Sequence, residues 1–512
     1  MNLQLKRVTT LFLTWEFFVL FLLCVASFVI RAYKINELLT ITYDQGRDLF
    51  FLEGITQGDL KLVGPTTGIA GVFLGPYFYY FLLPGFVLAY GNPVGVVLWQ
   101  ILGICLSLLF FYFLLKPYLG KWWALIGYFL LVINPGSIEQ SRQIWNPSLT
   151  VMTMLPAVYF LFTSLKKPWL LAVSTLLFGL ALQTELAYVI FLMPLGAGWI
   201  LYFNHLQHQT LQPALYSWKV LLVSALLFGA TVVPQLAFEV KNDLMMSKAI
   251  LTEIQDPARK VPLSQVWRYR PHALMAELND SLTAKAPGSR YLLWAVFAIS
   301  VINLVMVWER RHEPKFQPIA PLLLFWSAYF WLPLIGMMFH TGNYGNFFNY
   351  YVTAHYLPMI AMVVIFLSQL KFQRITASAL VSLYIVIFAR YAFFIYDTSI
   401  FQFSLAHQIN ALKHARELKT QTDTPIEMYV GNGLPKGYEY VNHWLEKTGQ
   451  VEPMHWTMNG NDEYIVMYEP FQDKTTRFFF LKWRQEYIDG HNCTGQKSFG
   501  IIKIRKCYKV SK

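Results

Sequence analysis

Apolar runs recur along the first 396 residues, separated by short polar segments. They lie near 11–30, 95–115, 122–136, 148–165, 168–183, 187–203, 219–238, 291–308, 318–339, 353–370 and 375–396. A helix that crosses the hydrocarbon core of a membrane needs ~20 mostly apolar residues. The pattern therefore predicts a polytopic α-helical membrane protein with about eleven transmembrane helices.

One further apolar segment, residues 73–90, is predicted not to cross the membrane. Helix-breaking residues interrupt it at Pro76, Pro84, Gly85 and Pro93, which favours a re-entrant or interfacial helix. The first apolar run follows Lys6 and Arg7 and lacks a small-residue cleavage site. We therefore expect it to be a retained membrane anchor.

The pattern changes after residue 396. The segments Ile426–Val430, Glu463–Tyr468 and Ser498–Tyr508 read as strands, and Tyr438–Lys447 reads as a helix. Residues 397–512 are thus predicted to form a small α/β domain that follows a transmembrane domain of residues 1–396.

Composition supports the membrane assignment. Only 14% of the 512 residues are charged and 55% are hydrophobic, whereas a soluble protein is about 25% charged. Mean hydropathy is +0.40. These values exclude a soluble enzyme, a disordered chain and a disulfide scaffold. Cys24 and Cys105 fall in apolar runs, whereas Cys493 and Cys507 can form one disulfide if their region faces an oxidising compartment.

The formal charge of +12 is best explained by membrane topology rather than by nucleic acid. A cytoplasmic N-terminus places twelve basic residues in the inner loops, against one, Arg142, in the short outer loops 137–147, 184–186 and 340–352. This arrangement requires that 73–90 not cross. It leaves 31–94, 239–290 and the C-terminal domain on the outer side.

Two outer loops carry candidate chemistry. The first contains Asp44 and Asp48 shortly after the first span, where a carboxylate can meet a lipid-linked substrate; the alternative is that one of them caps a helix. The second contains Arg142, followed by Asn146 and Pro147. On spacing alone, Asn146 is the N-cap and Pro147 the first residue of the next helix.

These loops resemble C-type glycosyltransferases that use polyprenyl-phosphate sugars, particularly the protein O-mannosyltransferase and aminoarabinose-transferase group. Asp44-Gln45 stands where that group has Asp-Glu, and Gln140-Ser141-Arg142 is intact. Asn146 stands where the group has an acid. Further similarity lies in three segments, Leu74-Gly75-Pro76-Tyr77, Leu182-Gln183-Thr184-Glu185 with Pro194, and Tyr350-Tyr351 through Tyr356-Leu357-Pro358. The departures at Gln45, Gly75 and Asn146 leave a divalent metal requirement open.

The resemblance implies an inverting glycosyl transfer on the outer face. An acceptor hydroxyl would attack the anomeric carbon while the lipid phosphate leaves, so a carboxylate base is required; Asp44 is the first candidate and Asp48 the second. Arg142 and then Arg390 are the candidates that stabilise the leaving phosphate. The alternative for Arg390 is that its side chain reaches to the membrane surface.

Other side chains are candidates for substrate binding. Arg268 and Arg270 in the long outer loop can contact a phosphate or a glycan, or can belong to a solvated face. Tyr351 and His355 lie in an amide-rich and aromatic segment suited to sugars, although tyrosine is common at membrane interfaces. Glu185 lies in a short outer turn, where it can contact the acceptor.

The resemblance thus implies a glycosyltransferase of a bacterial plasma membrane. Its expected partners are a polyprenyl-phosphate sugar, a glycan, lipid or protein acceptor, and membrane lipids, without nucleic acid. A transporter of lipid-linked glycans is the alternative; it should keep ionisable residues near the midplane of broken helices, whereas the polar residues here lie in outer loops. A glycan polymerase or ligase, which would use the same outer face, also stays open.

Overall fold

The computed structural model describes residues 15–209, 215–284, 289–396, 404–420, 426–429, 436–451, 463–468, 488–489 and 491–508. The chain divides into two compact units. The first, called the helical unit, comprises Met1–Ala32, Lys61–Phe81 and Trp99–Ala392. The second, called the mixed unit, comprises Tyr33–Leu60, Leu82–Leu98 and Phe393–Lys512. The predicted boundary after residue 396 stays a prediction.

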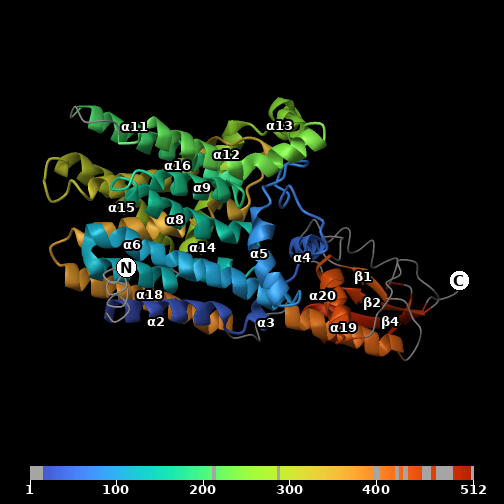
Figure 1. Ribbon diagram of the computed structural model, residues 1–512. Helices are drawn as coiled ribbons and strands as arrows, with labels where there is room; N and C mark the ends of the chain where they lie inside the picture. The colour runs from blue at the N-terminus through green and yellow to red at the C-terminus, as the bar shows by residue number, and fades with distance from the viewer. Residues whose placement is uncertain are drawn as a thin grey trace, which may run out of the picture. The chain divides into compact units, whose positions relative to one another are not determined.

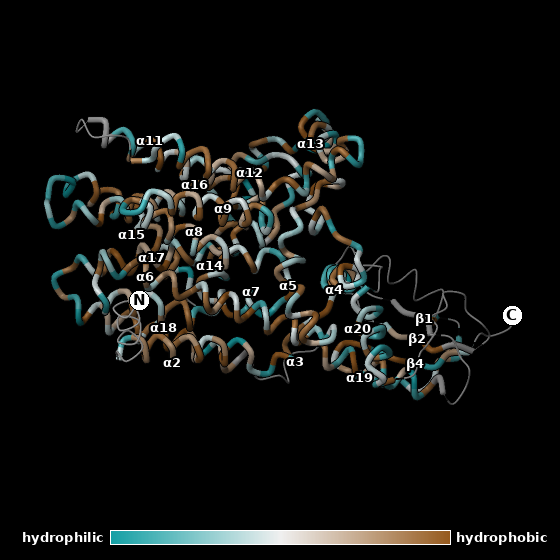
Figure 2. The backbone as a smooth tube through the Cα atoms, in the orientation of Figure 1, coloured by the Kyte–Doolittle hydropathy of each residue, from teal (hydrophilic) through white to brown (hydrophobic). Residues whose placement is uncertain are grey.

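Long helices form most of the helical unit (Figure 1). In chain order the helices that form it are α2 (Trp15–Ala32), α6 (Pro93–Val132), α7 (Pro135–Ser141), α8 (Thr150–Thr163), α9 (Leu170–Leu182), α10 (Leu186–Val189), α11 (Met193–Gln209), α12 (Trp218–Lys241), α13 (Met245–Gln255), α14 (Leu263–Thr283), α15 (Ser289–Arg310), α16 (Ala320–Phe339), α17 (Tyr356–Ser368) and α18 (Gln373–Tyr396), with short 3-10 turns η1 (Asn146–Leu149), η2 (Ile190–Leu192), η3 (Pro257–Arg259), η4 (Asn343–Gly345) and η5 (Asn349–Val352). Figure 2 shows apolar residues along the long helices of this unit, with hydrophilic residues mixed in at α13.

Eight helical segments of the described residues are long and apolar enough to cross a membrane. The difference from the eleven predicted spans has two causes. Helix α6 contains two of them, joined at Gly120, whose φ of 78° interrupts the helix. Helices α8 and α9 have only 14 and 13 residues, or about 20 Å of helix, although their positions match two predicted apolar runs.

Helix α5 (Tyr77–Leu88) occupies the segment that was predicted not to cross. It has 12 residues and contains Pro84, so its length of about 18 Å is shorter than the ~30 Å hydrocarbon core. The length of α5 therefore fits the prediction.

The helices of this unit pack through small and hydroxyl side chains. Ser174 on α9 donates to the carbonyl of Ala157 on α8 at 2.8 Å, and Thr175 donates to the carbonyl of Ser224 on α12 at 3.1 Å. A Cβ at Gly179 would overlap the side chain of Thr231. Such contacts let helix backbones approach closely. In a membrane, where lipid tails are as apolar as the side chains, this packing replaces the hydrophobic effect as the force that holds helices together.

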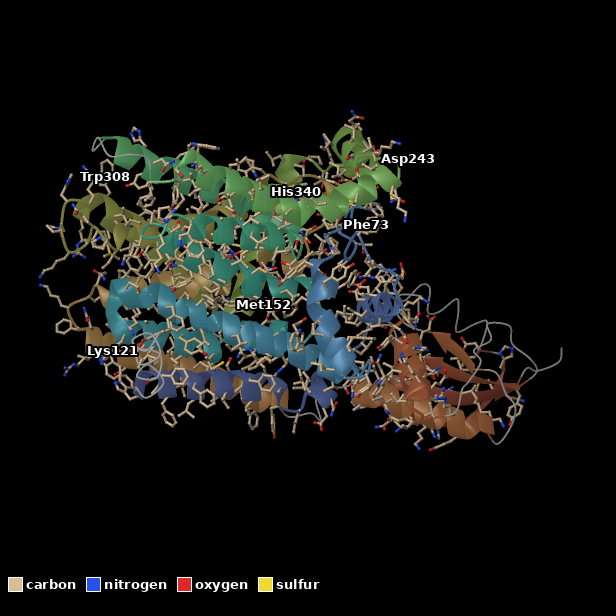
Figure 3. The ribbon with its side chains drawn as sticks, in the orientation of Figure 1. Phe73, Lys121, Met152, Asp243, Trp308 and His340 are labelled. Atoms are coloured by element: carbon tan, nitrogen blue, oxygen red, sulfur yellow. A yellow bond between two sulfur atoms is a disulfide. The ribbon has the colours of Figure 1, made fainter. Side chains whose placement is uncertain are left out.

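The two ends of the helical unit differ in the segments they carry. Figure 3 places Lys121 and Trp308 at one end and Phe73 and Asp243 at the opposite end. Lys121 belongs to a loop predicted to be cytoplasmic, and Trp308 lies next to another. The other pair belongs to loops predicted to face outward. The fold therefore separates these segments as the charge pattern predicted.

The mixed unit combines a sheet with helices from distant parts of the chain. Its elements are α3 (Ile35–Leu38), α4 (Tyr43–Thr56), α19 (Leu405–Thr420), β1 (Ile426–Tyr429), α20 (Lys436–Lys447), β2 (Glu463–Tyr468), β3 (Asn492–Phe499) and β4 (Ile502–Tyr508). The strand order is β1-β2-β4-β3. β1 pairs with β2 in parallel, and the other pairs are antiparallel. The small α/β fold is thus confirmed.

One strand prediction is wrong. The segment Ser498–Tyr508 is not a single strand, because the chain turns at Gly500, which has a φ of 58°. β3 ends at Phe499 and β4 begins at Ile502, so the two form a hairpin. A disulfide joins Cys493 and Cys507, which face each other across this hairpin.

Candidate functional site

The two candidate base residues lie on α4 in the mixed unit, and neither caps that helix. The cap is Thr42, which forms a capping box with Gln45: the Thr42 backbone N–H donates to Gln45 Oε1 at 3.1 Å. Gln45, at the position where the family has its second acid, therefore satisfies a helix end. The alternative that Asp44 or Asp48 is the cap is wrong.

Arg47 bridges Asp44 and Asp48. Its guanidinium lies 2.9 Å from an oxygen of Asp44 and 2.8 Å from an oxygen of Asp48. The Asp44 side chain is 52% exposed and that of Asp48 is 1% exposed. Asp44 is therefore the solvent-accessible carboxylate of the pair, whereas Asp48 is the buried partner that fixes Arg47.

Helix α4 is fixed against α20 by close backbone contact. A Cβ at Gly46 would overlap the backbone of Lys436, and one at Gly437 would overlap the carbonyl of Ile41. Glycine at both positions lets the two helices meet and sets the position of Asp44.

An ion-pair cluster completes this contact. Glu53 on α4 accepts from Lys447 at 2.6 Å and lies 2.9 Å from His443, both on α20. Burial raises the pKa of Glu53, but hydrogen bonds from Lys447 and His443 outweigh it and leave the pKa below its usual value. Glu53 is therefore a charged anchor of α4.

In the helical unit, several of the motif segments meet at the turn Gln183-Thr184-Glu185. Gln183 accepts from the backbone N–H of Tyr77 at 3.2 Å and donates to the carbonyl of Thr231 on α12. A Cβ at Gly75 would overlap the Gln183 side chain. Gly75, which stands where the family has a histidine, therefore leaves the space that the Gln183 side chain occupies.

Asn146 reaches the same turn. Its amide donates to the carbonyl of Thr184 at 2.7 Å, and the hydroxyls of Thr150 and Thr184 lie 3.1 Å apart. The expectation that Asn146 is an N-cap is wrong: Trp145 precedes η1, which starts at Asn146 and leads into α8. The amide makes a tertiary contact that local spacing does not reveal.

Glu185 is a buried carboxyl in the turn that precedes the span beginning at Leu186. It is 4% exposed, and it accepts from the backbone N–H of Ala187 at 3.1 Å. Burial raises its pKa to about 8, more than that hydrogen bond lowers it. Glu185 is also close enough to Tyr351 to interact with it electrostatically. The turn therefore joins Asn146, Glu185 and Tyr351 of the predicted site residues.

Arg142 lies elsewhere in the helical unit. It is 4% exposed, and its guanidinium donates to the carbonyl of Ile30 at 2.6 Å and to that of Arg31 at 3.1 Å. These are carbonyls at the C-terminal end of α2, where the last turn lacks helical partners. A third contact, at 3.4 Å, reaches the hydroxyl of Tyr391 on α18. Arg142 thus ties α2 to α18.

Sequence reasoning missed Arg31, a fully buried arginine at the end of α2. Its guanidinium donates to Ser27 at 2.8 Å, to the Ser137 hydroxyl at 2.9 Å and to the carbonyl of Val132 at 3.0 Å. An ionisable residue within a membrane-spanning segment is a functional candidate by default, but the predicted run 11–30 ended one residue before Arg31, which lies inside α2.

The two arginines of the long outer loop have different surroundings. Arg270 is buried and donates to the carbonyls of Met337 and Gly345 at 3.0 and 3.1 Å. Burial lowers its pKa. It therefore holds the 340–347 segment in place. Arg268 is exposed and its guanidinium lies 5.5 Å from the ring of Tyr269, so it stays accessible to an anion.

His355 and Arg390 are the last two candidates, and they differ in exposure. His355 is fully buried, and its Nδ1 lies 3.2 Å from the hydroxyl of Tyr188. Arg390 lies on α18 and is exposed. Within the described ranges, no group of three or more His, Cys, Asp or Glu side chains is placed to hold a metal ion.

No protein-family model matches the chain, and no curated protein matches its sequence. Solved structures do match. ArnT from Cupriavidus metallidurans bound to undecaprenyl phosphate aligns with a TM-score of 0.55 at 11% identity, covering 96% of this chain and 98% of that one. Its apo structure aligns with a TM-score of 0.51 at 11% identity, covering 96% and 97%.

The chain shares the fold of ArnT over nearly its whole length. The resemblance in the outer loops is thus confirmed for the architecture, and the chain is a multi-pass membrane protein. At 11% identity the likeness concerns the fold alone.

Proposed function

We propose that this C-type fold is a glycosyltransferase that moves a sugar from a polyprenyl-phosphate donor to an acceptor hydroxyl at the outer face of the membrane. The observation that carries the proposal is the fold shared over 96% of the chain with ArnT, whose crystal structure holds undecaprenyl phosphate. The exposed Asp44 on its anchored helix supplies the carboxylate that such a reaction needs.

In this proposal Asp44 takes the proton of the acceptor hydroxyl as that oxygen attacks the anomeric carbon. The bond to the lipid phosphate breaks on the opposite side, so the configuration of the sugar inverts. Arg47 lies between Asp44 and the buried Asp48. Arg47 and Asp48 therefore hold the base in position through charge-assisted hydrogen bonds.

The leaving phosphate gains negative charge and needs a nearby cation. Arg268 and Arg390 are exposed and are the candidates that we favour. Arg142 donates to carbonyls of α2, so a positioning role suits it better. Glu185, which burial keeps protonated at neutral pH, would donate a hydrogen bond to substrate without repelling the phosphate. The transferred unit would be a hexose or a pentose.

The test compares a deletion strain with its parent by glycan and lipid analysis, and then measures sugar transfer from a polyprenyl-phosphate donor in membranes. We expect one sugar modification to be missing from the glycans or lipids of the deletion strain. Membranes of the parent strain should transfer the sugar, and membranes of the deletion strain should not. A chain that moves the donor lipid across vesicle membranes without transferring sugar is a transporter, and that result contradicts the proposal.

We place the protein in a bacterial plasma membrane with a cytoplasmic N-terminus and an outer C-terminal domain. The prediction rests on the basic inner loops and on the position of Lys121 at the end of the helical unit opposite to Phe73 (Figure 3). Reporter fusions after Lys121 and after Lys512 should report opposite sides of the membrane. Reporters that agree on one side contradict this topology.

A further inference from the structure

A pocket of about 100 Å³ opens in the helical unit. Three segments contribute to it: the second outer loop, helix α14 and the region of η5. Trp145, Glu277 and Tyr350 are one lining residue from each segment. These segments were predicted to lie on the outer side of the membrane.

The pocket borders the Gln183-Thr184-Glu185 turn through two pairs of neighbouring residues. Trp145 lines the pocket, while Asn146 next to it donates to Thr184. Tyr350 lines the pocket, while Tyr351 interacts with Glu185. The pocket and the turn are therefore held by neighbouring residues of the same two segments.

The chemistry of the lining is acidic and aromatic. Among the lining residues there are three carboxylates, at Glu139, Glu277 and Asp280, and no Lys, Arg or His. Each carboxylate has about four acceptor positions, so it can accept from a ligand as well as from a neighbour within the protein. A ligand phosphate or carboxylate would find no Lys, Arg or His among the lining residues with which to form a charge-assisted hydrogen bond.

The remaining wall is suited to a sugar ring. The rings of Trp145 and Tyr350 meet edge to face at 5.3 Å. Gln140, Gln143 and Thr353 add amide and hydroxyl groups. Ser281 is 4% exposed, and its Oγ has no hydrogen-bond partner within the described part of the chain. A buried polar group of this kind gains by pairing with a ligand.

We propose that this pocket is the acceptor subsite and that it takes an uncharged, hydroxyl-rich saccharide. The carboxylates accept from sugar hydroxyls, the amides both donate and accept, and the aromatic pair covers one face of a pyranose ring. The assignment of the pocket to the acceptor rests on the proposed function, whereas the preference for a saccharide follows from the residues of the pocket alone.

The test uses the full-length protein in detergent on a glycan array that holds neutral, phosphorylated and uronic-acid glycans. We expect neutral glycans to bind. Trp145→Ala and Glu277→Gln should each weaken that binding about tenfold. Trp294→Ala and Glu309→Gln, at exposed positions of α15 outside the pocket, are the matched controls and should bind normally.

Thermal unfolding of each variant separates a binding defect from a folding defect, and Trp145→Phe should restore part of the binding if stacking matters. Selective binding of phosphorylated or acidic glycans, absence of glycan binding, or neutral binding that both pocket variants leave unchanged overturns the proposal. Neutral binding by a protein that transfers no sugar keeps the pocket assignment and refutes the glycosyltransferase.

Discussion

Asp44→Asn should lower sugar transfer by ~10²–10⁴-fold, the usual contribution of a general base, while the protein accumulates and folds normally. The substitution keeps the size of the side chain and removes its basicity. Because Thr42 and Gln45 cap α4, the change costs no helix cap. The exposed position of Asp44 also makes a packing defect unimportant. The assay is transfer from a polyprenyl-phosphate donor in membranes, normalised to the amount of protein.

Asp243→Asn is a suitable control for this experiment. Asp243 is exposed and has a φ of 52°, a backbone conformation that asparagine adopts as readily as aspartate. Its substitution should leave transfer unchanged. Near-normal transfer by the Asp44 variant would refute the assignment and move attention to Asp48. If neither carboxylate matters for transfer, the assignment of the general base to α4 is wrong.

Glu185→Gln should stabilise the protein at neutral pH and flatten its pH dependence. The folded state holds the carboxyl pKa at about 8, against 4.5 for an unperturbed glutamate. The folded state therefore binds a proton that the unfolded state has released, and stability falls as pH rises from about 4.5 through about 8. At pH 7 the protonation costs about 3 kcal/mol, which glutamine avoids.

Thermal unfolding in detergent between pH 5 and 9 measures this effect. The wild-type curve should decline across the range and that of the Glu185→Gln variant should not, so the two diverge most at the alkaline end. Glu309→Gln, at an exposed position on α15, is the control and should follow the wild type. Parallel curves for wild type and Glu185→Gln would show that the carboxyl is charged in the folded protein.

The sequence was most informative where the physical signal is local. Apolar runs located the long helices, and short strand-like segments located β1 and β2. The apolar pattern also separated the two halves of α6, although within this helix only Gly120 has a non-helical backbone. The hairpin β3-β4 was missed because β3 is mostly polar and exposed and because its turn at Gly500 contains only two residues.

The site was harder to predict because its contacts join distant segments. Spacing assigned Asn146 to a helix cap, whereas its amide bonds to Thr184, 38 positions away. Arg142 was read as a phosphate ligand, and its bonds to Ile30 and Arg31 cross more than a hundred residues. No local pattern encodes such partners. The roles of these residues in transfer stay predictions.

The anchoring of α4 on α20 also has a consequence for biosynthesis. Glu53 and Lys447 are 394 positions apart, so the helix that carries Asp44 leaves the ribosome long before the partner that fixes it. At 5–20 residues per second, that interval is about 20–80 s. A nascent or truncated chain can therefore insert its early helices into the membrane before α4, which carries Asp44, is packed against α20. Catalytic competence would then arrive only with the end of translation, and incomplete chains would not consume lipid-linked donor.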